Sequence, residues 1–211
     1  MVNFVLDKVG DADWDELVEA QFRSFSGEPY HDALFGFNTR ENQIETKKRH
    51  IHELTESTSY LWLKIVDQDA GKIAGAAYWK IKPNYIPLNR EELNITWLDS
   101  QEDREAANRL LMTVQDRKLA NVKEAHIQLE LLFVTPEYQR HGIGTRLLKW
   151  GCDLADHMAL PIWIESSREG YRMYCSQGVE DVEYHVIEAG RFKTAYTLMR
   201  RSPNLQAALL N

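Results

Sequence analysis

The most constraining feature of this chain is the stretch of residues 134–145, which reads VTPEYQRHGIGT. It follows an apolar run at residues 129–134 and leads into an amphipathic run at residues 143–158, an order that predicts a strand, a tight turn and a helix. Gly142 and Gly144 leave room for an anion to approach the main chain, and the first turn of the helix would direct unpaired N–H groups at it. The stretch therefore predicts a binding site for a pyrophosphate group.

Length, charge and cysteine content exclude several classes of protein. The 211 residues suit a single domain, and a formal net charge of −7 without a Lys/Arg tract argues against a broad nucleic-acid surface. Only Cys152 and Cys175 are present, so we expect no disulfide framework. The chain shows neither a signal-peptide core nor an apolar run approaching the ~18 residues of a membrane-spanning helix. We therefore expect a cytoplasmic protein, with a nuclear location also open, and no membrane partner.

The first 81 residues predict a strand, two helices and a hairpin. The strand is expected at residues 4–9, and a helix starts near Trp14 with Asp13 and Glu16 as a capping pair. A loop rich in Gly, Pro and aromatic residues is expected at residues 26–38, and Thr39 then caps a second helix ending near residue 54. The strands at 60–66 and 72–81 are joined by a short turn and should pair antiparallel.

The second half predicts one parallel strand pair within a mixed sheet. An ordered segment of about 40 residues, 83–122, includes a helix from Gln101 to about residue 119 that Ser100 caps. Strands are expected at 125–134, 161–166, 182–188 and 192–200, with helices at 143–158 and 170–175. A strand–helix–strand unit of this size implies parallel strands with a right-handed crossover. No repeat or second domain boundary is visible, so residues 1–211 are interpreted as one domain with an insertion at about 83–122.

Two motifs resemble those of the GCN5-related N-acetyltransferase (GNAT) family. Residues 139–144 read QRHGIG, which is similar to the family's Gln/Arg-x-x-Gly-x-Gly/Ala loop. Residues 170–179 are similar to its Ala/Gly-x-x-x-Tyr-x-x-x-Gly-Phe segment, with Val179 in place of the Phe. The resemblance implies an α/β fold of the α+β type. It implies a mixed, mostly antiparallel sheet of six to seven strands, splayed between strands four and five and flanked by helices, with a helical insertion before strand four.

The resemblance also implies acetyl-CoA as co-substrate. Amides around Arg140, Gly142, Ile143, Gly144 and Thr145 would face its pyrophosphate, and the Thr145 hydroxyl would be a further donor. Its pantetheine arm would lie between the splayed strands, paired with main-chain groups of Leu132, Phe133 and Val134. Ser167 stands where the family often has Asn near this arm. The remaining residues predicted to bind the cofactor are Gln139, His141 and Tyr174.

Tyr174 and Glu130 are the catalytic candidates. A phenol holds its proton at neutral pH and could donate it to the departing thiolate, so Tyr174 is the candidate acid; the alternative is an aromatic anchor for its short helix. Glu130 could accept the proton of the amine directly or through water, or it could be a solvent-facing or salt-bridged carboxylate. The histidines form no plausible metal set with acidic residues, and no metal is expected.

The acceptor is predicted to be a small-molecule or peptide amine. Its site would be built from residues 26–38 and the insertion, with wall candidates Tyr30, Phe35, Phe37, Tyr85 and Trp97. The predicted reaction is direct attack of the amine on the thioester in a ternary complex. An acyltransferase with another acyl chain or an oxygen acceptor stays open, as does a CoA-binding regulatory module without turnover. Pairing into a homodimer is also open.

Overall fold

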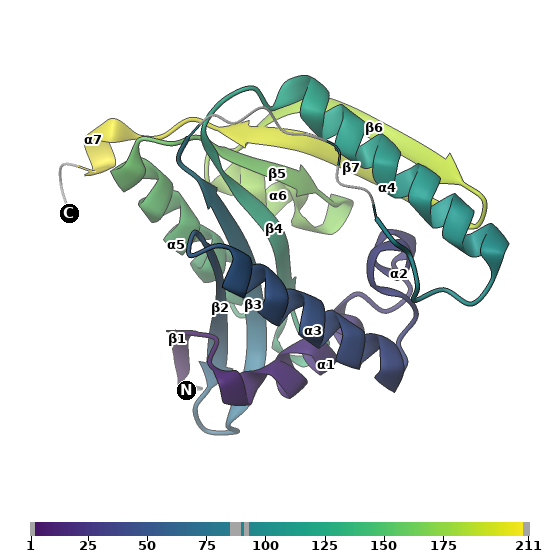
Figure 1. Ribbon diagram of the computed structural model, residues 1–211. Coiled ribbons are helices and arrows are strands. Elements are labelled where there is room, and N and C mark those ends of the chain that lie inside the picture. The colour runs from purple at the N-terminus through teal and green to yellow at the C-terminus, as the bar shows by residue number, and fades with distance from the viewer. Residues whose placement is uncertain (1–2, 85–89, 91–92, 209–211) are drawn as a thin grey trace.

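The computed structural model describes residues 3–84, 90 and 93–208 (Figure 1). In chain order its strands and α-helices are β1 (Phe4–Lys8), α1 (Trp14–Ser24), α2 (Pro29–Phe35), α3 (Arg40–Glu56), β2 (Tyr60–Asp67), β3 (Lys72–Lys82), α4 (Gln101–Asn121), β4 (His126–Val134), α5 (Ile143–Met158), β5 (Ile162–Ser166), α6 (Arg168–Ser176), β6 (Glu180–Ala189), β7 (Phe192–Arg201) and α7 (Leu205–Ala208). Short 3₁₀ turns lie at Asp11–Asp13 and Pro136–Tyr138.

The described strands form one seven-stranded sheet in the order β1-β2-β3-β4-β5-β7-β6. β4 and β5 are parallel, and the other neighbouring strands are antiparallel. The crossover between the parallel strands is α5, as the strand–helix–strand pattern predicts. The predicted mixed, mostly antiparallel fold is therefore confirmed.

Helix α5 packs one apolar stripe on a face of the sheet, together with α6. Its inward side chains recur every three or four residues and are each less than 5% exposed: Ile143, Leu147, Leu148, Cys152 and Ala155. Gly151 allows a close approach to β3, since a Cβ at this position would come within 2.1 Å of the Trp79 indole. We call this side of the sheet the α5 face.

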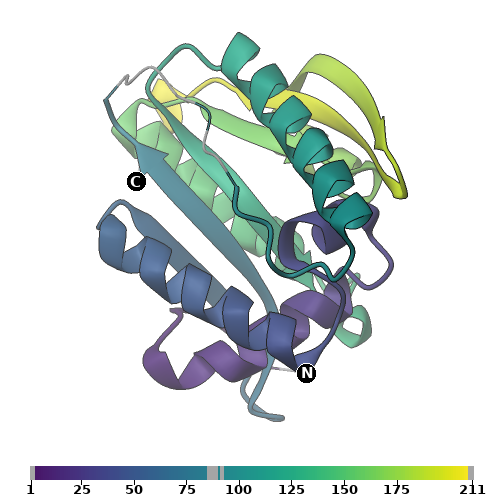
Figure 2. The same cartoon turned by 45° about the vertical axis from the view of Figure 1, so that its right-hand side comes forward.

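The opposite side of the sheet carries two separate apolar clusters. One lies between α1 and strands β2 to β4, with Leu17, Phe22 and Trp62 among its members. The other lies under α4 and α2 against β5, β7 and β6, with Leu110 and Phe192. Strands β3 and β4 are seen between α3 and α4 in Figure 2. We call this side the α3/α4 face, and polar side chains occupy its centre.

Local predictions were confirmed where a single residue caps a helix. Thr39 Oγ1 accepts from Asn42 N at 3.2 Å, and Ser100 Oγ accepts from Asp103 N at 3.0 Å. The capping pair expected for α1 was wrong. Asp13 instead accepts from Gly10 N at 2.6 Å, and Glu16 accepts from Ile73 N of β3 at 3.0 Å.

The loop predicted at residues 26–38 contains helix α2. Pro29, which suggested a loop, stands at the start of this helix, where a missing N–H costs nothing. Gly36 ends the helix with a φ of 83°. The helix places Tyr30 against the cluster under α4.

Candidate active site

The N-terminus of α5 is open on its outer side. Gly142 is the N-cap with φ 78° and ψ 4°, and Arg140 also has a positive φ of 66°, so the chain turns sharply from β4 into the helix. Within the described residues, no acceptor pairs with the amides of Gly142, Ile143, Gly144 and Thr145. A Cβ built on Gly142 meets no atom within 4 Å. Four N–H donors with a helix dipole behind them are an arrangement that favours an anion.

Two side chains of the predicted loop bind the loop itself. His141 Nδ1 lies 2.8 Å from Gln139 O and 3.2 Å from Tyr138 O, and the Gln139 amide donates to Val134 O at 3.4 Å. These contacts stabilise the turn. The exposed Arg140 and Thr145 side chains flank the open amides.

Gly144 was predicted to bind the cofactor through its amide, and it also allows close packing. The residue is buried, and a Cβ here would lie 2.9 Å from Met173 Sδ of α6 and 3.6 Å from Leu132 and Val134 side-chain carbons. The absence of a side chain thus allows α5, α6 and β4 to meet closely. Gly142, by contrast, is open.

Strand β4 contains a β-bulge at Glu130. Tyr78 of β3 pairs with Leu131 and the next residue, Trp79, pairs with Leu129, which leaves Glu130 as the extra residue. Leu129 belongs to the core of the α5 face, and Leu131 packs on the opposite core. Bulges are common beside active sites because they redirect side chains and end pairing.

The sheet splays immediately after the bulge. β4 pairs with β5 at Ile127, Gln128 and Leu129, and the described pairing continues no further along β4 (Figure 1). Thr135 N donates to Ala74 O of β3 at 3.0 Å, and main-chain groups alternate in direction along a strand. Leu132 and Val134 therefore face the side from which β5 diverges.

The main-chain groups of Phe133 face the other way, toward its partner Ala76 on β3. Of the three strand residues predicted to pair with the cofactor, Phe133 is therefore the one whose main-chain groups are directed at β3. Ser167 is exposed and caps α6, with its Oγ accepting from Gly170 N at 3.4 Å.

Tyr174 lies on α6 in the core of the α5 face and is 7% exposed. Its ring rests on Gly170, where a Cβ would lie 2.7 Å from a ring carbon. No described group forms a hydrogen bond with its hydroxyl. Burial raises the pKa of Tyr174, so this phenol keeps its proton at neutral pH.

Glu130 lies on the α3/α4 face between two lysines. Its carboxylate is 3.8 Å from Lys80 Nζ of β3 and 3.9 Å from Lys118 Nζ of α4. Burial alone would raise the pKa of Glu130, but the positive charges of Lys80, Lys118 and Lys82 outweigh it and lower the pKa to about 2. A carboxylate with such a low pKa is a weak proton acceptor.

The aromatic residues predicted to line the acceptor site lie in two different environments. Burial raises the pKa of Tyr30, and the charges of Glu165 and Glu130 raise it further, so this phenol adjoins the polar centre of the α3/α4 face. Phe35 is a core residue at 6% exposure. Phe37 and Trp97 pack beside the cluster under α4, beneath the guanidinium groups of Arg191 and Arg49 respectively. Tyr85 lies outside the described residues.

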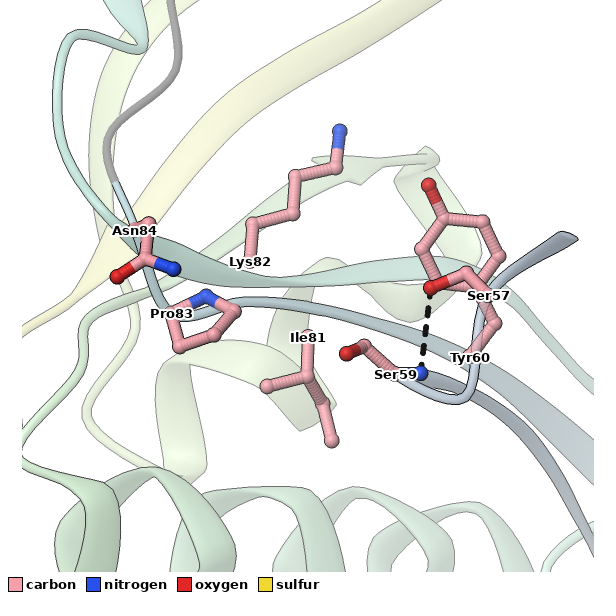
Figure 3. A pocket seen from close by; sticks show the side chains of 7 residues that line it. All are labelled: Ser57, Ser59, Tyr60, Ile81, Lys82, Pro83 and Asn84. Atoms are coloured by element: carbon pink, nitrogen blue, oxygen red, sulfur yellow. Dashed lines mark hydrogen bonds between the residues drawn. The ribbon is translucent and has the colours of Figure 1, made fainter.

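A hollow of about 280 Å³ lies at the end of β3 remote from the phosphate loop (Figure 3). Tyr60, Ile81 and Asn84 are among the residues that line it, and Ser59 N donates to Ser57 Oγ at 3.2 Å. None of the individual residues predicted from the sequence for the site belongs to its lining.

Two further features of the described residues bear on metal chemistry and on membranes. No group of three His, Cys, Asp or Glu side chains in this part of the chain is arranged to hold a metal ion. Among the described helices, none combines the length and apolar character needed to cross a membrane.

A splayed parallel strand pair beside an open helix N-terminus is the arrangement that the resemblance to acyl-CoA-dependent transferases implies. Residues 14–174 match the sequence profile described as the acetyltransferase (GNAT) family. The chain belongs to this family. No curated protein sequence matches the chain at a significant level.

Solved structures of similar fold are acetyltransferases. Arylalkylamine N-acetyltransferase 2 from Aedes aegypti is 13% identical, with a TM-score of 0.66 and coverage of 96% of this chain and 100% of that one. A histone acetyltransferase HPA2 and related acetyltransferase from Corynebacterium glutamicum is 14% identical, with a TM-score of 0.62 and coverage of 97% and 98%. A phosphinothricin acetyltransferase from Sinorhizobium meliloti, solved with AcCoA, is 14% identical, with a TM-score of 0.59 and coverage of 95% and 89%. At these identities the likeness concerns the fold.

Lys80 and Lys118, which flank Glu130, were not predicted from the sequence. They come from β3 and α4 and meet Glu130 only in the folded chain. No local spacing links them, although a lysine within the apolar strand 72–81 is an unusual residue that could have drawn notice.

Proposed function

We propose that this protein transfers the acetyl group of acetyl-CoA to a primary amine by direct attack while both substrates are bound. The observation that carries the proposal is the open N-terminus of α5, whose amides from Gly142 to Thr145 have no acceptor within the described residues. Family membership supports acetyl-CoA as the donor of the acetyl group.

The diphosphate of the cofactor would bind these amides and the Thr145 hydroxyl. Arg140, exposed beside them, adds a positive charge. Gln139 and His141 contribute through the shape of the turn, because their side chains bind loop carbonyls. The open space at Gly142 lets the phosphate oxygens approach the main chain.

The pantetheine arm would continue along β4 where β5 has diverged. The main-chain groups of Leu132 and Val134 are directed there and would pair with its amides as a neighbouring strand does. Ser167, at the start of α6, flanks the same gap. The N–H of Leu132, next after the bulge on this side, is the proposed donor to the oxyanion.

Acetyl transfer then needs one bond formed and one broken. The bound ammonium group first loses one proton to water, and the neutral amine then attacks the thioester carbon. The C–S bond breaks, and the thiolate takes the proton of Tyr174. Burial raises the pKa of Tyr174, so its proton is still present when the thiolate forms, and no described partner occupies the hydroxyl. The amine loses its own proton to water, and Tyr174 is reprotonated from solvent after the thiol leaves.

Glu130 is proposed to orient the acceptor. A carboxylate whose pKa is about 2 stays ionised at neutral pH, so it attracts an ammonium group but accepts a proton poorly. This role replaces that of a direct general base. The position of Glu130 in the bulge places it next to the splay.

A thiol-release assay with acetyl-CoA and a panel of amines tests the proposal. We expect release of CoA that depends on an amine and a product with one added acetyl group by mass spectrometry. CoA binding without release for any amine would instead support the regulatory-module alternative. No CoA binding at a concentration of about 1 mM, the upper end of ordinary KM values, would contradict the cofactor site itself.

A further inference from the structure

The pair formed by Lys80 and Glu130 is a partly buried ion pair without hydrogen bonds. The side chains are 15% and 31% exposed, and Nζ lies 3.8 Å from Oε1. Among the described residues, nothing donates a hydrogen bond to the Glu130 carboxylate and nothing accepts one from the Lys80 ammonium. Buried charges are normally hydrogen-bonded as well as paired, so this pair has unused bonding capacity.

The surroundings of the pair alternate in charge. Lys80 Nζ also lies 3.5 Å from Glu53, and Lys118 Nζ lies 3.2 Å from Glu165. Three carboxylates thus face the ammonium groups of Lys80 and Lys118, and Lys82 adds its charge to those that act on Glu130. The cluster is close to neutral in sum. A receptor for a purely cationic acceptor would gain from an excess of negative charge, which this cluster does not have.

Aromatic rings border the pair. Lys80 Nζ is 5.3 Å from the ring centre of Tyr60 and 5.1 Å from that of Tyr78. Tyr30 adjoins Glu130 from α2. Tyr30 and Tyr60 are partly exposed and offer apolar surface beside the two charges, whereas Tyr78 is buried. Both charges stand on strands of the sheet, which hold them in place.

We propose that Lys80 and Glu130 recognise an acceptor that carries a carboxylate beside its amine, as a free α-amino acid does. The inference rests on the proposed acetyl transfer and names its substrate class. Glu130 binds the ammonium group and Lys80 binds the carboxylate. The two groups of an α-amino acid are one carbon apart, which suits head groups separated by 3.8 Å.

The experiment compares tyrosine, tyrosinamide and tyramine in the thiol-release assay, with leucine and 3-methylbutylamine as a second pair. The amide and the amines lack the carboxylate charge and keep the rest of the molecule. We expect kcat/KM for each amino acid to exceed that of its analogues without the carboxylate at least tenfold. Equal or better use of tyrosinamide or tyramine would overturn the inference while leaving acetyl transfer intact.

Two variants separate the roles of the charges. Lys80→Met keeps the length of the side chain, and we expect it to reduce the preference for tyrosine over tyramine to near one, mainly through KM. Glu130→Gln should raise KM for both, because both carry an ammonium group. Lys64→Met is the matched control: Lys64 is a partly buried strand lysine that donates to Asp13 at 2.5 Å, and its loss should leave the preference unchanged.

The outcomes distinguish the two proposals. A preference that persists in Lys80→Met contradicts the assignment of Lys80, provided that thermal melting shows the variant folded. If Lys80→Met does not fold, the Glu130→Gln variant provides the test. An unchanged KM for tyramine in that variant would contradict the proposal that Lys80 and Glu130 recognise the acceptor. Absence of thiol release with every amine contradicts the acetyl transfer on which the inference rests.

Discussion

The two faces of the sheet hold their buried charges in different ways. On the α5 face, Arg201 of β7 binds Asp156 of α5 through two hydrogen bonds of 2.7 and 2.9 Å, and Asn204 N adds a third to the same carboxylate at 2.6 Å. On the α3/α4 face, the Lys80–Glu130 pair is 3.8 Å apart and has no hydrogen bond within the described residues. The side chains of Arg201 and Asp156 are 11% and 7% exposed.

We interpret this difference between the two ion pairs as a division of roles: one pair stabilises the fold, and the other lies at the proposed ligand site. The fully hydrogen-bonded Arg201–Asp156 pair holds α5 against β7. We propose that this keeps the N-terminus of α5 in place to bind a diphosphate with its main-chain groups. An unsaturated pair leaves side-chain bonds to be completed by another molecule. We therefore relate the α5 face to the cofactor and the α3/α4 face to the acceptor.

The largest effect is expected from Tyr174→Phe. Loss of the proton donor should lower kcat about 1,000-fold, with little change in either KM, because the phenol acts after both substrates are bound. Steady-state kinetics measure this split. Tyr171→Phe is the control on the same helix, since the Tyr171 hydroxyl binds Asp181 at 2.8 Å on the surface. A fall in kcat of less than about threefold would remove Tyr174 from the mechanism.

Asp156→Asn should cost about 3 kcal/mol of stability, because it leaves Arg201 buried without its partner charge. Glu130→Gln should cost less than Asp156→Asn, because no hydrogen bond is lost and Lys80 and Lys118 keep Glu53 and Glu165 as partners. Urea unfolding of both variants at neutral pH compares the two faces directly. Equal losses in the free energy of unfolding would contradict the view that only the Arg201–Asp156 pair serves mainly to stabilise the fold.

The Arg201–Asp156 ion pair also makes the stability of the fold depend on pH. Burial raises the pKa of Asp156, but the hydrogen bonds from Arg201 and Asn204 outweigh it and hold the pKa below its ordinary value of 3.8. The contribution to stability is therefore complete above that value and is lost as the pH falls through the folded-state pKa. The stability difference between wild type and Asp156→Asn should accordingly shrink below about pH 4. A difference that grows with acid would contradict this sign.

Gly142→Asp should weaken CoA binding roughly 100-fold, by placing a carboxylate where the diphosphate approaches. Gly71→Asp is a closely matched control. Gly71 also has a positive φ, 64° against 78°, and open space around an added Cβ, but it lies in the β2–β3 hairpin. The two variants should lose similar stability while only the first loses affinity by calorimetry. Similar affinities would contradict the placement of the diphosphate.

The smallest effect is expected from Thr145→Val, which removes one hydroxyl and keeps the size of the side chain. CoA affinity should fall roughly tenfold, as for one hydrogen bond to a charged group. Thr113→Val, where the hydroxyl binds Arg109 O on α4, should have no effect on affinity. A loss as large as that in Gly142→Asp would mean that the side chain and not the main chain binds the anion.

The proposed cofactor site was easier to predict from the sequence than the proposed acceptor site, because its elements are consecutive along the chain. The strand, the glycine turn and α5 are consecutive, and α5 begins and ends at the predicted residues, 143 and 158. The sequence did not predict the bulge at Glu130, since it depends on the register with β3. That register also directs the main-chain groups of Phe133 at β3.

The acceptor half was less predictable because it depends on tertiary contacts. Helix α2 was taken for a loop, since Pro29 and the flanking glycines are turn residues as well as helix boundaries. Lys80, Glu130 and Lys118 come from three elements and meet only after folding. Their pairing, and its lack of hydrogen bonds, has no signature along the chain.

Calorimetric titration with CoA, 3′-dephospho-CoA and pantetheine tests the central claim most directly. If the amides from Gly142 to Thr145 bind the diphosphate, the two nucleotide-bearing ligands should bind with similar affinity. Pantetheine, which keeps the strand-like arm but lacks the diphosphate, should bind at least roughly 100-fold more weakly. Pantetheine binding as tight as that of CoA would contradict the account.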